Sequence, residues 1–157
     1  MYIRFGHQSS LAHNQEKSWL VGAEMSISWW EMVLRLVLAV ALGAVIGFQR
    51  ERAGKPAGLR TNTLICLGAA LFTIVSVSGF SMDPARVAAG IVTGIGFLGA
   101  GAIIMRREEG MVIGLTTAAT IWAVAAIGLA VGLGMYLVAV VASALVLGIL
   151  YLPHPIR

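Results

Sequence analysis

The chain has 157 residues, of which 59% are hydrophobic and only 11% are charged. A soluble domain carries about a quarter charged residues, so this chain has too little polar surface to cover a water-soluble globule. The composition therefore predicts one membrane-embedded domain. The formal net charge is +4, but the basic residues lie in short loops between apolar runs, which excludes a nucleic-acid-binding protein.

Five apolar runs approach the length of about 20 residues that a membrane-spanning helix needs. They predict an all-α membrane protein of about five transmembrane helices. A polar, disordered tail is expected over 1–30, the membrane domain over 31–153, and a short cytoplasmic tail over 154–157. The predicted spans are 32–48, 61–80, 87–105, 115–131 and 135–152.

Lysine and arginine gather in alternate breaks between these runs, at 49–60 and 106–114. The positive-inside rule places both loops in the cytoplasm, with a periplasmic N-terminus and a cytoplasmic C-terminus. Arg35 lies near the outer end of the first span. We expect it to extend toward the interface, with Glu31 one helical turn away as a possible partner.

An internal repeat aligns residues 42–75 on residues 98–131 without a gap. Both copies consist of a helix, a basic loop and a second helix, and both start from the same side. This pattern predicts a parallel repeat of helix pairs, with the fifth helix outside it. The matches in and beside the loops are Arg50 with Arg106, Gly54 with Gly110, Gly58 with Gly114, Leu59 with Leu115, and Thr61 with Thr117.

Glycines recur in the first, third and fourth spans, in part at four-residue spacing. Such faces let helix backbones approach closely in lipid. We predict that they pack helices together; a glycine-lined pore or a hinge is the alternative. They are Gly43, Gly47, Gly90, Gly94, Gly96, Gly99, Gly101, Gly128 and Gly132.

The basic loops are the first candidate for a functional site. We expect Thr61 to cap the second helix, and Thr116 or Thr117 to cap the fourth. Helix N-termini and arginine both favour phosphate or carboxylate, so the hypothesis is a cytoplasmic site for a lipid headgroup, a nucleotide or an acidic partner. The alternative is that these charges only set topology and contact anionic lipid. The candidate residues are Arg50, Glu51, Arg52, Arg60, Thr61, Asn62, Arg106, Thr116 and Thr117.

In the short outer loop, Asp83 precedes Pro84 and is expected to cap the third helix, with Arg86 as its ion-pair partner. Away from the helix ends, the spans contain no acidic, basic or histidine residue. Ion and proton relays usually depend on such a group. The sequence also offers no metal-ligand cluster and no nucleophile–base pair. We therefore expect neither an enzyme nor a cofactor or metal site.

Several of these motifs, in this order, resemble the MgtC/SapB family over about 32–152. They are Gly43-Ala-Val-Ile-Gly47, Arg50-Glu-Arg, Gly58-Leu-Arg-Thr, Asp83-Pro-Ala-Arg86, Gly94-Ile-Gly-Phe-Leu-Gly-Ala-Gly101 and Gly114-Leu-Thr-Thr-Ala-Ala119 with Trp122. The resemblance implies a bacterial inner-membrane protein tied to magnesium homeostasis. It also implies a regulator more than a carrier, with the F-type ATP synthase as a proposed partner.

The chain departs from this family at Asn62, where histidine is usual, and at Gly90, where glutamine is usual. Because it stops at Arg157, it resembles the short form, without a C-terminal ACT-like domain. We expect a regulatory or accessory membrane protein that acts through its basic loops. The alternatives are a small Mg²⁺ transporter or channel with a path between the repeats, and a structural or lipid-binding module. Exposed small-residue faces also favour a homodimer.

Overall fold

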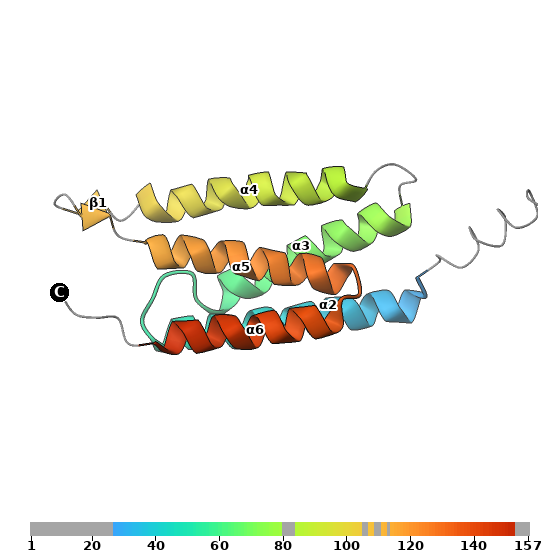
Figure 1. The fold of residues 1–157 in the computed structure, drawn as a ribbon, viewed down its shortest axis with the longest axis horizontal. Helices are drawn as coiled ribbons and strands as arrows, with labels where there is room; N and C mark the ends of the chain where they lie inside the picture. The colour runs from blue at the N-terminus through green and yellow to red at the C-terminus, as the bar shows by residue number, and fades with distance from the viewer. Residues whose placement is uncertain (1–26, 80–83, 105–106, 109–110, 113, 153–157) are drawn as a thin grey trace, which may run out of the picture.

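A computed structural model describes residues 27–79, 84–104, 107–108, 111–112 and 114–152. Within them the chain forms five helices and one small antiparallel hairpin (Figure 1). The helices are α2 (Trp29–Arg52), α3 (Leu59–Gly79), α4 (Pro84–Ile104), α5 (Leu115–Gly132) and α6 (Tyr136–Tyr151). The hairpin pairs β1 (Arg107–Glu108) with β2 (Met111–Val112).

The prediction of an all-α membrane protein is confirmed, because α2 to α5 are each long and apolar enough to cross a membrane. The fifth predicted span, α6, is equally apolar but has only 16 residues. It therefore spans about 24 Å, less than the roughly 30 Å of a hydrocarbon core. The sequence did not predict the hairpin, because two-residue strands are too short to show an alternating pattern.

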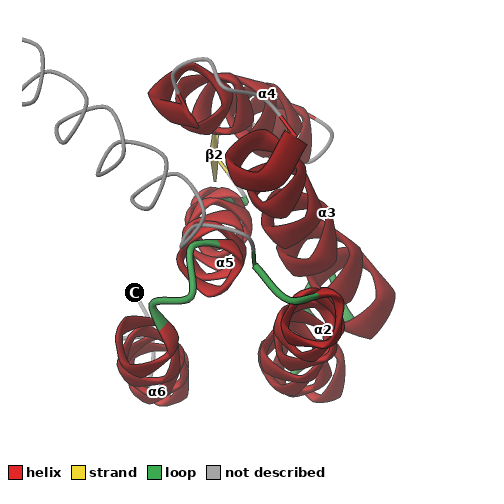
Figure 2. Ribbon diagram, turned by 90° about the vertical axis from the view of Figure 1, so that its right-hand side faces the viewer, coloured by secondary structure: helices red, strands yellow, loops and turns green. Residues whose placement is uncertain are grey.

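Helix α5 lies at the centre of the bundle and contacts each of the other four helices (Figure 2). Its glycines make this position possible. A Cβ added at Gly132 would lie 2.6 Å from the Thr73 Cβ of α3, and one added at Gly128 would meet the Cys66 carbonyl oxygen. Only glycine lets the α3 and α5 backbones approach this closely.

The other predicted packing glycines divide into two groups. Gly43 and Gly47 face α3, where an added Cβ would lie 2.8 Å from the Cys66 Cβ and 2.7 Å from the Leu59 Cα, respectively. Gly99 has room, since the nearest atom, on Ala118, would be 3.6 Å away. For four glycines of α4, an added Cβ would meet no described atom within 4 Å apart from the adjacent backbone of α4 itself, so these glycines pack against no other described helix. They are Gly90, Gly94, Gly96 and Gly101.

The parallel repeat is visible in the backbone. In the first pair, α2 and α3 are antiparallel neighbours, and the Asn62 amide donates to the Gly58 carbonyl at 3.2 Å as α3 begins. In the second pair, α4 and α5 are antiparallel neighbours, and the Ala118 amide donates to the Gly114 carbonyl at 2.9 Å. These hydrogen bonds join equivalent residues of the repeat, so the second helix of each helix pair begins at the equivalent position.

The two flanks of the repeat are not equally filled. On one flank, α6 packs against both α5 and α2. On the opposite flank, a groove of about 710 Å³ opens between α3 and α4. Its lining is apolar and includes Ile65, Phe72 and Ile91 together with Gly68, Gly90 and Gly94.

Candidate functional site

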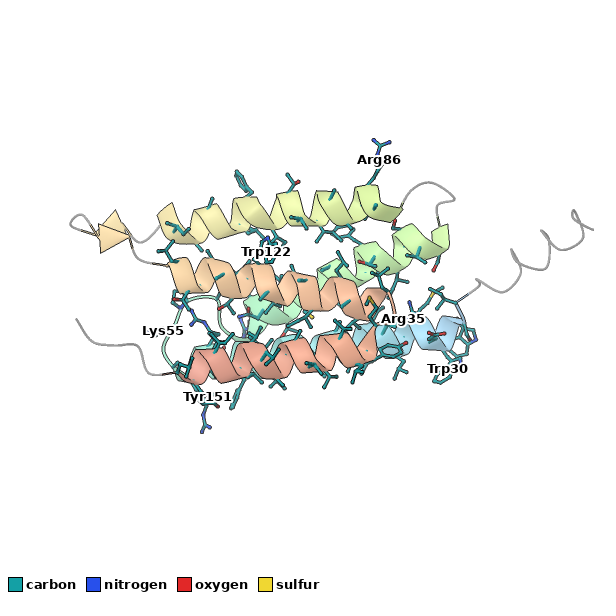
Figure 3. All side chains as sticks on the ribbon, in the orientation of Figure 1. Trp30, Arg35, Lys55, Arg86, Trp122 and Tyr151 are labelled. Atoms are coloured by element: carbon teal, nitrogen blue, oxygen red, sulfur yellow. The ribbon has the colours of Figure 1, made fainter. Side chains whose placement is uncertain are left out.

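Basic side chains collect at the end of the bundle where α2 turns into α3. We call this the basic end and define it by Arg50, Arg52, Lys55 and Arg60. Lys55 marks it in Figure 3, whereas Trp30, Arg35 and Arg86 lie toward the opposite end. Three of the four defining side chains are exposed, and Arg50 alone is buried.

Arg50 is 4% exposed, although it lies within one turn of the end of α2. Its Nη2 donates to the Thr117 Oγ1 of α5 at 2.7 Å. Its Nε is buried and has no hydrogen-bond acceptor among the described residues, and within that part of the chain no carboxylate oxygen lies within 4.0 Å of its nitrogens. A buried guanidinium with one neutral partner and no counter-charge is costly.

Thr117 and Thr116 do not cap α5. The helix begins at Leu115 after Gly114, whose φ of 104° is left-handed, and no side chain accepts from its first turn. Both threonines therefore lie inside the helix: Thr116 is exposed, and Thr117 is buried as the acceptor for Arg50. Gly114 is required here because an added Cβ would lie 2.6 Å from the Ala102 carbonyl oxygen.

The turn between α2 and α3 is fixed by two of the predicted residues. Glu51 Oε2 accepts from the Leu59 amide at 2.8 Å, so Glu51 supplies the cap that was predicted for Thr61, which is exposed inside α3. Asn62 Nδ2 donates to the carbonyl oxygens of Ala57 and Gly58. This holds Ala57 at a φ of 55°, a left-handed conformation that costs a non-glycine residue about 1–2 kcal/mol.

The remaining predicted residues that the structure describes do not join Arg50. Arg52 is exposed, and its guanidinium carbon lies 5.2 Å from the centre of the Phe48 ring. Arg60 is exposed, and so is Arg86, which points away from the bundle in Figure 3. Helix α4 begins at Pro84, as predicted. Arg106 and Asp83 lie outside the described residues.

Sequence analysis did not find the most complete polar cluster of the structure, the Arg35 cluster of Glu31, Arg35, Gly132 and Tyr136. Arg35 donates to Glu31 Oε1 at 2.7 Å, to the Gly132 carbonyl at 2.6 Å and to the Tyr136 hydroxyl at 3.3 Å. The tyrosine in turn donates to Glu31 Oε1 at 3.2 Å. The four-residue spacing of Glu31 and Arg35 predicted the ion pair, whereas the partners on α5 and α6 left no signal.

Four apolar helices of membrane-spanning length, arranged as two hairpins with a polar cluster near each end, define a multi-pass helical membrane protein. The chain belongs to the MgtC family, because the profile of that family matches residues 36–157. The resemblance found in the motifs is thereby confirmed. No solved structure matches the chain.

Curated relatives support the same assignment. The "Putative magnesium transporter YhiD" of Escherichia coli (strain K12) is 46% identical over 133 residues, which is 79% of this chain and 61% of that protein. Protein MgtC of Salmonella typhimurium (strain 14028s) is 50% identical over 73% of this chain and 49% of its own length. Protein SapB of Bacillus subtilis is 40% identical over 71% and 53%. The chain thus spans about half to three-fifths of the length of these relatives.

Proposed function

We propose that this chain is a regulatory or accessory membrane protein of magnesium homeostasis, which recognises a partner or ligand at its basic end. The link to magnesium rests on family membership and on the name of the YhiD relative. The observation that supports recognition is the buried, incompletely bonded Arg50 beside the first turn of α5. By the positive-inside rule, this end faces the cytoplasm.

The interior of the bundle supports a regulator more than a conduit. Among the buried hydroxyls of the spans, those of Thr73, Thr120 and Ser143 each donate to the carbonyl four residues earlier in their own helix, which satisfies them within single helices and not along a polar path between helices. Among the described residues, no three histidine, cysteine or acidic side chains are grouped to hold a metal. The groove between the repeats is lined by apolar side chains, which cannot replace the water around Mg²⁺.

The test compares transport with growth. The purified full chain would be reconstituted in liposomes, and Mg²⁺ entry followed with an internal indicator, against empty vesicles. In parallel, wild type and Arg50→Met would be expressed in bacteria deprived of their own family member and grown in low magnesium. We expect no saturable flux, and growth support that is lost in Arg50→Met.

The matched control is Arg86→Met, which removes the same charge from an exposed side chain at the opposite end of the bundle. It should support growth as wild type does. Saturable Mg²⁺ flux through the wild type would contradict the proposal and indicate a transporter. Equal growth of the wild type and Arg50→Met would show that the function does not depend on Arg50 at the basic end.

A further inference from the structure

Two arginines of α2 lie at opposite ends of α5, and they interact with the dipole of α5 in opposite ways. The C-terminal end of a helix carries partial negative charge and the N-terminal end partial positive charge, each about half a unit. Arg35 donates to the carbonyl of Gly132, the last residue of α5, so its charge matches the dipole. Arg50 contacts Thr117 in the first turn of α5, so two positive charges meet there.

At the first turn of α5, the described hydrogen-bond donors outnumber the described acceptors. The amides of Leu115, Thr116 and Thr117 have no acceptor within their own helix, because they precede its first internal hydrogen bond. No side chain caps them in the described structure. The Arg50 Nε adds a buried donor that has no acceptor among the described residues. Free amides, a guanidinium and a helix N-terminus together form a site suited to an oxyanion.

We infer that Arg50 and the first turn of α5 bind a phosphate group. The inference deepens the proposed function and rests on it, since it names what the basic end recognises. The exposed Arg52, Lys55 and Arg60 surround this site with further positive charge, and Glu51, the one nearby carboxylate whose side chain is described, already accepts from the Leu59 amide. A phosphate group would accept hydrogen bonds from the free donors. Its negative charge would also compensate the positive charges of the guanidinium and the α5 N-terminus.

The phosphate can belong to a membrane lipid or to a soluble molecule, and the two sources are separable. The full chain would be purified in a maltoside detergent, which contains no phosphate, and its thermal unfolding midpoint measured. One series adds inorganic phosphate at constant ionic strength set with chloride. A second adds phosphatidylglycerol to the micelles, with an uncharged lipid as the reference. Binding to the folded state raises the midpoint.

We expect the midpoint to rise in at least one series, and the series that responds identifies the source. Arg50→Met should bind at least about tenfold more weakly, since a charge-assisted bond is lost. Arg86→Met, which removes an equal charge from an exposed side chain at the opposite end of the bundle, is the control and should keep the response. Midpoints without added ligand show whether each variant is folded. Glu108→Gln/Glu109→Gln tests whether these residues supply the counter-charge themselves.

Three results would overturn the inference: no rise in either series, an equal loss in Arg50→Met and Arg86→Met, or a response that appears only in the Glu108→Gln/Glu109→Gln variant. The last result would mean that the chain's own carboxylates fill the site. The proposed function fails separately. If phosphate does not bind and growth in low magnesium still depends on Arg50, the ligand class is wrong while the regulatory site stands.

Discussion

The Arg35 cluster and the Arg50 site place the same side chain, on the same helix, in two different situations. Arg35 is 7% exposed and has a carboxylate, a backbone carbonyl and a hydroxyl as partners. Arg50 is 4% exposed, and within the described part of the chain its one partner is a hydroxyl and its Nε has no acceptor. Burial alone therefore does not distinguish them. The completeness of the hydrogen bonding does, and it is the reason why we propose a binding role for Arg50 and a structural role for Arg35.

The comparison predicts the largest loss of stability for Arg35→Met. The substitution leaves Glu31 without its ion-pair partner and the Gly132 carbonyl without its donor, at a helix end packed against two neighbours. We expect the free energy of unfolding to fall by about 2 to 3 kcal/mol, mainly because the buried Gly132 carbonyl loses its donor, while the partly exposed ion pair contributes little. It would be measured by denaturation with sodium dodecyl sulfate in mixed micelles. A variant as stable as wild type would show that the Arg35 cluster does not join α2 to α5.

Two glycines with left-handed backbones provide a matched pair, one at each end. Gly134 has a φ of 79°, and an added Cβ would lie 2.8 Å from the Arg35 Nη2; Gly54 has a φ of 63° and open space around it. In both alanine variants, a non-glycine residue must adopt a left-handed backbone conformation, which costs about 1 kcal/mol. Gly134→Ala must in addition displace the Arg35 side chain. We expect losses of about 2 kcal/mol for Gly134→Ala and about 1 kcal/mol for Gly54→Ala in the same denaturation assay. Equal losses would mean that Arg35 adapts freely.

The smallest expected effect concerns the one hydrogen bond of Arg50. Thr117→Val removes the acceptor and leaves the guanidinium with no partner, which should cost about 1 kcal/mol. Arg50→Met removes the buried charge and should change stability little. The double variant should therefore lose less than Thr117→Val alone. A double-mutant cycle measures this coupling, and additive losses would indicate that Arg50 is bonded elsewhere.

Much of the fold followed from the sequence because it depends on composition. In lipid every backbone polar group needs an internal partner, so long apolar runs form helices. The predicted spans accordingly match α2 to α5 closely. The length of α6 and the hairpin at Arg107–Glu108 and Met111–Val112 were less accessible, since the ends of apolar runs are poorly marked and the strands have two residues each.

The candidate site was predicted only in outline. The repeat placed Arg50 and Thr117 in equivalent loops of different copies, but gave no reason for them to touch. Capping preferences pointed to Thr61 for α3 and to Thr116 or Thr117 for α5. These predictions were wrong because Glu51 reaches the α3 N-terminus from the preceding helix, while α5 begins after Gly114, which has no side chain to cap it. Contacts between helices distant in sequence carry no local signal.

The sequence by itself determined that the protein is embedded in a membrane, and it determined the helical spans, the repeat and the family. Each of these depends on residue types and their order along the chain. Only the tertiary structure decided which glycines are in contact, which flank α6 covers, and that the two buried arginines of α2 lie at opposite poles of α5. These depend on how the helices pack. The position of a charge relative to a neighbouring helix dipole is fixed by that packing alone.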